Sequence, residues 1–154
     1  GEFKNMRFLI QRVNHAKVTV DHNITGQIQK GFLVFIGIAN EDTKEIADKL
    51  IRKMTGLRIF EDADGKTNLA LKDVNGSLLL VSQFTLYADC KKGNRPSFVH
   101  AGAPAYANEL YEYIISECKK TGIIVERGIF GADMKIELEN AGPFTIMLDS
   151  KELM

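Results

Sequence analysis

The apolar run GFLVFIGIA, at residues 31–39, limits the fold of this chain more than any other segment. A strand with one face in water alternates apolar and polar residues, whereas a run without polar side chains is typical of a strand buried on both faces. We therefore expect residues 31–39 to form a central strand. Such a strand needs a covering layer on each side, and the rest of the chain must supply both layers.

The other β-rich runs are short and numerous. RFLIQRV and AKVTVD (7–13 and 16–21) predict a hairpin-like start, and HNITG (22–26) predicts a turn. In MKIELE the alternation places Met134, Ile136 and Leu138 on one face of a strand. The later runs LRIFE, LLLVSQFTLYAD, IIVER, MKIELE and FTIMLD predict five more strands, at 57–61, 78–89, 123–127, 134–139 and 144–149, with a tight turn at DADG (62–65).

Two segments have the period of a helix. The apolar residues of 41–56 recur at helical spacing, with an acidic start, a basic end and Gly56 as a stop. A second helix is expected between Pro104 and Gly122. With many strands and two helices, the sheets must cover each other on one side and the helices must cover the other. The sequence therefore predicts an α/β fold, a single-domain three-layer β/β/α sandwich with mixed or mostly antiparallel sheets.

The length of 154 residues suits one domain rather than two. The opening GEFKN has no periodic pattern, so we expect residues 1–5 to be an expression leader and residues 6–154 to be the single domain. No apolar segment approaches the ~20 residues of a membrane-spanning helix. Two cysteines, Cys90 and Cys118, do not make a disulfide framework. We expect a cytoplasmic protein.

The chain carries no excess of basic residues. Twenty basic and twenty acidic side chains give a net charge of zero, which argues against a general nucleic-acid coat protein. Recognition of one nucleic-acid end by a local basic cluster remains open. Such clusters are CKKGNRPS (90–97) and CKK (118–120), and each also fits an ordinary solvated surface.

Several kinds of chemistry find little support. His15, His22 and His100 lie far apart in the sequence and belong to no CxxC or HExxH spacing, so we expect no metal site. The absence of a GxGxxG or Walker motif argues against a nucleotide cofactor. Cys90 and His100 lie in one loop region, which leaves a Cys–His hydrolase as an alternative. This pair has no third orienting residue and no local signature, so a surface or half-buried thiol is the better explanation of Cys90.

Two polar insertions interrupt apolar strands. SQFTL (82–86) places Ser82, Gln83 and Thr85 where a buried strand should continue, and buried hydroxyls and amides require hydrogen-bond partners. NAGPFT (140–145) interrupts the last strands with a Gly-Pro pair. Taken alone, the first insertion fits a polar network in the core and the second fits a hairpin turn. Their joint occurrence is more specific than either.

SQFTL followed by NAGPFT resembles the D-aminoacyl-tRNA deacylases, whose motifs are Ser-Gln-x-x-Leu and Asn-x-Gly-Pro-x-Thr. Phe144 departs from the usual valine of this family. The family hydrolyses the ester between a D-amino acid and the 3′-terminal adenosine of tRNA, as a homodimer without metal or cofactor. The resemblance covers essentially all of the chain after the leader and includes IQRV, GLRIFEDADGK, RPSF and GIFGADM (10–13, 56–66, 95–98 and 128–134).

The resemblance implies a site shared between two subunits. The Gly142–Pro143 loop of one subunit, with Asn140 and Thr145 in its motif, would enter the pocket of the partner and exclude L-amino acids. Opposite the loop, Ser82 and Gln83 would position the substrate, while backbone N–H groups near Phe84 and Thr85 would stabilise charge on the ester carbonyl. The remaining implied roles are loop support by Arg12, adenine binding by Phe130 and Met134, and acceptor-stem phosphate contacts by Lys91, Lys92 and Arg95.

Some alternatives stay open at this stage. Thr85 could attack the ester, but no activating base is evident, so we favour hydrolysis by a water molecule that the ribose 2′-OH assists. A filter that works by steric exclusion should also admit glycyl-tRNA. The sequence does not reveal the isomer of the Gly142–Pro143 bond. Rival functions are an enzyme with a trans Gly-Pro loop that edits a small L-amino acid, a noncatalytic dimer that binds tRNA ends, and a Cys90-dependent hydrolase.

Overall fold

The apolar run that begins at Gly31 forms β3 (Gly31–Gly37), which pairs with β1 (Arg7–Val20) on one side and β6 (Ser77–Ser82) on the other. Alternate side chains of β3 enter two different hydrophobic clusters. Phe32 and Val34 belong to the cluster beneath the helices, and Leu33 belongs to a second cluster on the opposite face. The prediction of a central strand buried on both faces is confirmed.

The computed structural model describes residues 5–153, and of the expected leader only Asn5 falls in this range. The other elements are β2 (Asn23–Ile28), α1 (Lys44–Thr55), β4 (Phe60–Glu61), β5 (Thr67–Leu69), the 3-10 helix η1 (Leu71–Val74), the 3-10 helix η2 (Phe84–Tyr87), α2 (Pro104–Lys120), β7 (Val125–Arg127), β8 (Lys135–Asp149) and α3 (Ser150–Leu153). The main sheet has the strand order β2-β1-β3-β6-β7, and β8 pairs with the other edge of β1. β3, β6 and β7 are parallel and the other pairs are antiparallel.

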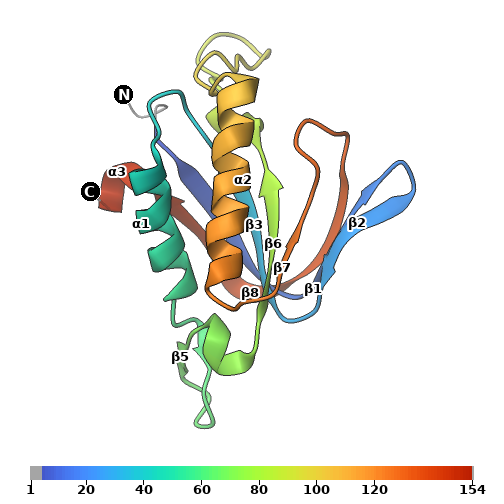
Figure 1. Cartoon of the computed structure of the whole chain (residues 1–154), viewed down its shortest axis with the longest axis vertical. Helices are drawn as coiled ribbons and strands as arrows, with labels where there is room; N and C mark the ends of the chain where they lie inside the picture. The colour runs from blue at the N-terminus through green and yellow to red at the C-terminus, as the bar shows by residue number, and fades with distance from the viewer. Residues whose placement is uncertain (1–4, 154) are drawn as a thin grey trace.

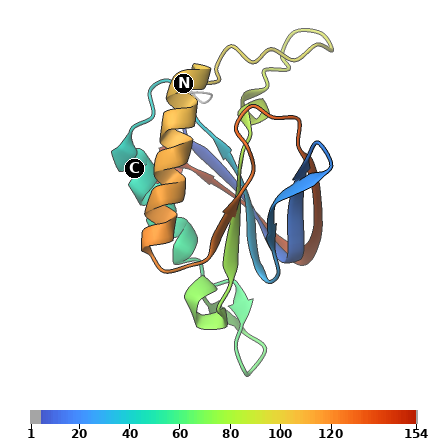
Figure 2. The ribbon, with the colours of Figure 1, turned by 45° about the vertical axis from the view of Figure 1, so that its right-hand side comes forward.

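Three layers follow from the way β1 bends. Its first half pairs with β3 and its second half pairs with β2, while β8 follows it along nearly its whole length. Helices α1 and α2 lie side by side over one face of the sheet, and the β1–β2–β8 half curves over the other face (Figures 1 and 2). At the contact between β2 and β7, a Cβ on Gly26 would lie 2.6 Å from the carbonyl oxygen of Arg127, so only glycine fits. The predicted β/β/α arrangement in a single α/β domain is confirmed.

Both predicted helices are present. The Thr43 hydroxyl accepts a hydrogen bond from the Ile46 N–H at 3.2 Å, which starts α1, and the Gly56 N–H donates to the Arg52 carbonyl at 3.1 Å, which ends it. Pro104 occupies the first turn of α2, where its missing N–H costs no helical hydrogen bond. Their buried faces pack on the first core cluster.

The prediction of a hairpin-like start at residues 7–21 was wrong, because residues 7–20 form one strand. A register shift next to His15 inserts a bulge, and this bulge changes which residues face which cluster. Before the bulge Phe8 and Ile10 face the helices, and after it Ala16 and Val18 face the second cluster. One continuous strand can therefore contribute to both cores. The predicted turn at 22–26 was also misplaced: the chain reverses at Asp21–His22, where both φ angles are positive (48° and 67°), and Asn23–Ile28 is β2.

The last three strands were counted wrongly as well. Residues 135–149 form one strand, β8, and the expected hairpin at the Gly-Pro pair is absent because both of its flanks pair antiparallel with the same strand β1. From Gln11 to Val13 β1 advances two residues, whereas from Thr145 to Asn140 β8 covers five. The extra residues leave the ladder as a loop. Both flanks of the Gly-Pro pair run antiparallel to β1, so they run in the same direction as each other. The two arms of a hairpin would run in opposite directions.

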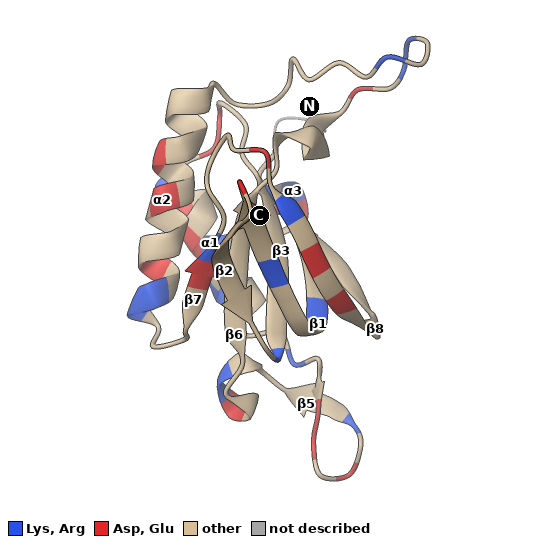
Figure 3. Cartoon of the chain, turned by 90° about the vertical axis from the view of Figure 1, so that its right-hand side faces the viewer, with Lys and Arg blue, Asp and Glu red and all other residues tan. Residues whose placement is uncertain are grey.

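Charged side chains are spread over the described residues. Both basic and acidic residues occur on the helices and on the strands in the view of Figure 3. On the pair β1–β8 some of these side chains form ion pairs, such as Lys17 with Glu137 at 3.3 Å. The helices in the described part of the chain include none that is long and apolar enough to span a membrane.

Candidate active site

A cavity of about 430 Å³ opens at the carboxyl ends of the parallel strands β3 and β6. Ligands commonly bind at such strand ends in sheets with parallel strands. Its walls come from the end of β6, the start of α2 and the segment before β8, and they bring together five of the residues expected from the sequence: Ser82, Gln83, Phe84, Phe130 and Met134. A larger and more open hollow of about 490 Å³, at the end of α1, contains none of the expected residues.

The floor of the cavity is the point where β6 stops. The Gln83 N–H donates the last hydrogen bond of the ladder to the Ile36 carbonyl at 2.8 Å, and the chain then turns into η2. The expectation that residues 78–89 continue as a strand was therefore wrong beyond Ser82. The tight turn is anchored by Tyr87, which is fully buried and donates its hydroxyl to the Asn5 carbonyl at 2.6 Å.

The η2 turn leaves backbone N–H groups and polar side chains of the SQFT segment available for a ligand. The first N–H groups of a helical turn, here those of Phe84 and Thr85, have no acceptor within the turn itself. The Gln83 side-chain amide donates a hydrogen bond to the Thr85 hydroxyl. Phe84 is 57% exposed at the rim of the cavity, and its ring meets the edge of Phe98 with 5.2 Å between centroids. The segment thus presents donors and an aromatic face.

The opposite wall carries Phe130 and Met134, and a buried tyrosine holds it to the floor strand. Tyr111, on α2, donates its hydroxyl to the Leu80 carbonyl at 2.7 Å, and the Gly128 N–H donates to the same oxygen at 3.0 Å. Burial raises the pKa of Tyr111 to about 12, so the hydroxyl remains a donor at neutral pH. A Cβ on Gly128 would lie 2.6 Å from the sulfur of Met134, so glycine lets this side chain lie against the turn.

An ion pair adds to the support of this wall. Arg127 forms a two-point contact with the Glu112 carboxylate, lies over the Tyr111 ring and donates its Nε to the Gly128 carbonyl at 3.2 Å. The sequence reasoning missed Tyr111, Arg127 and Glu112. A tyrosine on the apolar face of a predicted helix and an arginine at the end of a predicted strand were the available signals, but neither fixes which carbonyl they reach.

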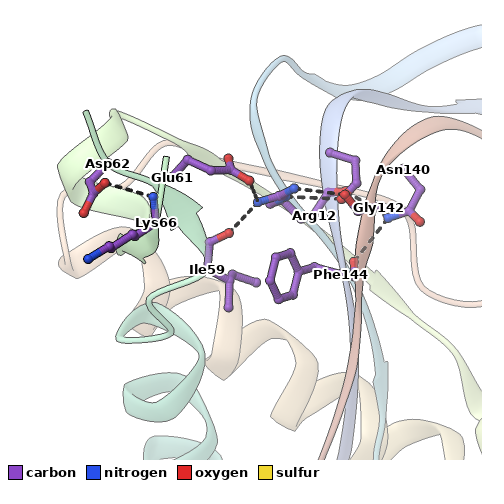
Figure 4. Close-up of polar contacts among 9 residues, drawn as sticks. Arg12, Ile59, Glu61, Asp62, Lys66, Asn140, Gly142 and Phe144 are labelled. Carbon is purple, nitrogen blue, oxygen red and sulfur yellow. Dashed lines mark hydrogen bonds and ion pairs between the residues drawn. The ribbon is translucent and has the colours of Figure 1, made fainter. Parts of the chain in front are cut away.

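The Gly142–Pro143 loop forms a second group of expected residues, shown in Figure 4. Arg12 is 6% exposed and donates its Nε to the Ala141 carbonyl and its Nη2 to the Gly142 carbonyl, both at 3.2 Å. Its guanidinium carbon lies 4.6 Å from the centroid of the Phe144 ring. The peptide bond between Gly142 and Pro143 is cis, the isomer that the sequence left open. The loop is therefore fixed from below by a buried cation.

Two further residues of the loop motif close its base. Asn140 donates its side-chain amide to the Arg12 carbonyl at 3.0 Å and to the Phe144 carbonyl at 3.2 Å. Thr145 accepts a hydrogen bond from the Gln11 amide at 3.4 Å. Above this base Gly142 and Pro143 are exposed, and a Cβ on Gly142 would have no atom of its own chain within 4 Å.

The two groups do not meet within one chain. Gly142 and Pro143 do not line the cavity that contains Ser82 and Phe130; Arg12 and Ala141 instead line a smaller cavity of about 180 Å³. The expected meeting of the loop with the SQFT segment therefore requires a second copy of the chain, and it stays a prediction.

The remaining expected residues lie outside both groups. Cys90 is exposed, and the recorded ion-pair contact of His100 is with Asp89 at 3.5 Å, so the suggested Cys–His pair gains no support. Lys91, Lys92 and Arg95 are exposed on a hairpin that the Asp89–Ser97 bridge closes. Within residues 5–153, no three His, Cys, Asp or Glu side chains cluster in a way that could hold a metal ion.

Comparisons with known proteins match nearly the whole length of the chain. The family model described as D-Tyr-tRNA(Tyr) deacylase matches residues 9–149. A D-aminoacyl-tRNA deacylase of Lactobacillus delbrueckii subsp. bulgaricus is 58% identical over 94% of this chain and 99% of its own. One from Thermotoga petrophila is 50% identical over 96% of this chain and 99% of its own.

Two solved structures share the fold of this chain. A protein described as "c-Myc DNA Unwinding Element Binding Protein" is 36% identical, with a TM-score of 0.86 over 92% of this chain and 97% of that one. A structure described as "a probable eukaryotic D-amino acid tRNA deacylase" has a TM-score of 0.82 over 94% of this chain and 99% of that one, and its 19% identity shows the shared fold alone. By its family model and its relatives, this chain belongs to the D-aminoacyl-tRNA deacylase family.

Proposed function

We propose that this protein hydrolyses the ester bond of D-aminoacyl-tRNA and releases the free D-amino acid and tRNA. The observation that carries the proposal is the cavity at the end of β6, which combines Ser82 and Gln83 on its floor with Phe130 and Met134 on its wall. The chain also belongs to a family whose relatives are named for this activity, and this membership supports the proposal of the same substrate.

The terminal adenosine and the ester fit different walls of the cavity. Phe130 offers an aromatic face on which adenine stacks, and Met134 packs beside it. The ester carbonyl then lies over the N–H groups of Phe84 and Thr85, which stabilise the negative charge of the tetrahedral intermediate. The ribose 2′-OH assists the attacking water, and Gln83 and Thr85 orient the reacting groups through their shared hydrogen bond.

Chiral selection is proposed for the Gly142–Pro143 loop of a second copy of the chain. In a C2 homodimer each loop would enter the cavity of the partner and create two equivalent sites. The exposed loop, held from below by Arg12, would accept the α-ammonium group through its carbonyl oxygens. An L-residue would drive its Cβ into the loop, whereas a D side chain would point away from it. Glycine has no Cβ, so glycyl-tRNA is also a substrate. The cellular site of this activity is the cytoplasm, where charged tRNA is used.

The decisive assay compares D- and L-tyrosyl-tRNA under matched conditions with a chelator present, and adds glycyl-tRNA. Rapid cleavage of the D-ester, slow cleavage of the L-ester and measurable cleavage of glycyl-tRNA support the proposal. A preference for the L-ester would instead indicate an editing enzyme for L-amino acids, and binding without turnover would indicate a noncatalytic tRNA-end-binding protein. If the D-ester is cleaved while glycyl-tRNA is untouched, exclusion by the loop is the wrong mechanism.

A mixing experiment tests whether the site is shared. Gly142→Val places a side chain where the chain has open space, so the variant should fold but block its partner's cavity. Ala132→Trp fills the cavity from its own wall. Each variant alone should be inactive, and an equal mixture that has exchanged subunits should regain about a quarter of the wild-type activity, because half of the dimers carry one intact site. A mixture that stays inactive would place the loop and the cavity of one subunit in the same site.

A further inference from the structure

Glu61 contacts Arg12, the residue that supports the Gly142–Pro143 loop, and does so from the side away from the loop carbonyls. It belongs to the β4–β5 hairpin, far from the loop in sequence, and its Oε1 accepts a hydrogen bond from Arg12 Nη1 at 3.1 Å (Figure 4). The same Nη1 donates to the Ile59 carbonyl at 2.6 Å. Arg12 therefore joins two segments: its Nε and Nη2 hold the loop, and its Nη1 is held by the hairpin.

Positive side chains outnumber negative ones around Arg12. The small cavity beneath the loop is lined by two cations, Arg12 and Lys30, and by one carboxylate, Glu61. The Arg12 side chain is 7% exposed, so water screens its charge poorly, whereas the Glu61 side chain is 52% exposed. A backbone hydrogen bond within Glu61 itself, followed by the hydrogen bond and the charge of Arg12, holds the pKa of Glu61 below its usual value, so this carboxylate is ionised at neutral pH.

We propose that Glu61 is a positioning residue that supplies the counter-charge for Arg12 and thereby lets the Gly142 carbonyl accept the α-ammonium group of the substrate. This inference rests on the proposed function. The Gly142 oxygen accepts from the Arg12 guanidinium at 3.2 Å, so an ammonium group bound to the other side of that oxygen is close to a second positive charge. Two like charges near one carbonyl repel each other, and an anion next to Arg12 reduces this repulsion.

The hairpin offers a matched control. Asp62 is the neighbour of Glu61 and carries the same charge, but its Oδ1 accepts from the N–H groups of Asp64 and Lys66, at 2.9 and 3.0 Å, within the turn. Asp62→Asn keeps an oxygen for these two contacts and removes one negative charge from the same hairpin. Glu61→Gln likewise keeps an oxygen for Arg12 and removes the charge, and Glu61→Asp keeps the charge on a shorter side chain.

The experiment measures kcat/KM for two esters: D-tyrosyl-tRNA and the matching ester of 3-(4-hydroxyphenyl)propionic acid, which has no α-amino group. For Glu61→Gln we expect kcat/KM to fall about tenfold on D-tyrosyl-tRNA, mainly through KM, and to stay within about twofold on the uncharged ester. Asp62→Asn should match the wild type on both esters, and Glu61→Asp should restore part of the loss.

The outcomes distinguish a failure of the proposed role of Glu61 from a failure of the proposed deacylase function. Equal losses on both esters in Glu61→Gln would show a merely structural role, and no loss on D-tyrosyl-tRNA would show no role; either result overturns the inference. A loss in Asp62→Asn that equals the loss in Glu61→Gln would assign the effect to the charge of the hairpin as a whole and also overturns it. If the wild type does not cleave D-tyrosyl-tRNA, the proposed function itself fails.

Discussion

The side-chain amide of Gln83 donates a hydrogen bond to the hydroxyl oxygen of Thr85. An amide is not a base at neutral pH, so this contact cannot take the proton of the hydroxyl as a nucleophilic mechanism requires. The contact orients Thr85 instead. It also accounts for two polar side chains where a strand was expected to continue, because β6 ends at Ser82, Gln83 lines the cavity and Thr85 accepts the hydrogen bond of Gln83.

The role of Thr85 is tested by Thr85→Ala. Because we expect Thr85 to orient rather than attack, kcat should fall by no more than about fivefold, the size of one lost neutral hydrogen bond. Rapid-quench analysis of the wild type should reveal no acyl-enzyme. Thr85→Ser, which keeps the hydroxyl, is the control. A fall of several orders of magnitude in Thr85→Ala, or a trapped ester on Thr85, would establish the nucleophile.

The base of the Gly-Pro loop is tested by Asn140→Asp. This change is nearly isosteric but replaces a group that donates to two carbonyl oxygens by a group that only accepts. We expect the free energy of unfolding to fall by about 2 kcal/mol, from two lost hydrogen bonds, and the D-over-L selectivity to fall with it. Asn94→Asp, at an exposed position of the 89–97 hairpin, makes the same chemical change and should alter neither. Urea unfolding and the paired tyrosyl-tRNA assay measure both quantities.

Adenine binding is tested at Phe130. Stacking on an aromatic ring contributes about 1–3 kcal/mol per base, so Phe130→Ala should raise KM about tenfold with a smaller effect on kcat. Phe130→Tyr keeps the ring and should behave like the wild type. Phe130→Leu keeps an apolar side chain without a ring and should resemble Phe130→Ala. A leucine variant with wild-type KM would mean that Phe130 only packs against the core.

A buried carboxyl predicts how stability depends on pH. Asp42 is 1% exposed, and its burial raises its pKa from 3.8 to about 6, although its Oδ2 accepts from the Ala39 N–H at 2.7 Å. The folded state therefore holds this proton more tightly than the unfolded state does. The resulting stability is fully present below pH 3.8 and is lost as the pH rises through about 6.

This loss amounts to about 3 kcal/mol, and Asp42→Asn should abolish it. The difference in unfolding free energy, wild type minus Asp42→Asn, should decrease between the pKa of 3.8 in the unfolded chain and the pKa of about 6 in the folded protein, and be constant above that range. Urea unfolding across this range measures it. A difference that does not change with pH would mean that Asp42 does not titrate in this window.

Thiol alkylation tests the Cys90 alternative. Burial raises the pKa of Cys118 to about 12, and the side chain is fully buried, so iodoacetamide should leave it intact in the native protein. Cys90 is exposed and should be modified alone, as intact mass will show. Because no step of the proposed reaction uses a thiol, the alkylated protein should keep its deacylase activity within about twofold. Loss of activity that Cys90→Ser does not reproduce would point to the size of the adduct, whereas loss in both would support a thiol hydrolase.

Local patterns were enough for the elements whose burial is decided within one segment. The run at 31–39, the two helical periods and the alternation of 134–139 each predicted an element that the structure contains, because a strand or helix must bury its own apolar face. Patterns failed where a distant partner decides the geometry. Asn14 and His15 suggested a break in the first strand, but β8 pairs on both sides of them and the chain passes through a bulge.

The sequence by itself determined the layer order and the family, and it singled out the two motifs from which the site is proposed. Tertiary structure alone decided that Gly142 lies in a loop within one long strand, that Arg12 holds its carbonyl, and that Glu61 from another hairpin holds Arg12. The physical reason is that apolar periodicity records which side of an element is buried. The register between strands more than a hundred residues apart, and the carbonyl oxygens that a buried guanidinium finds there, depend on packing of the whole domain.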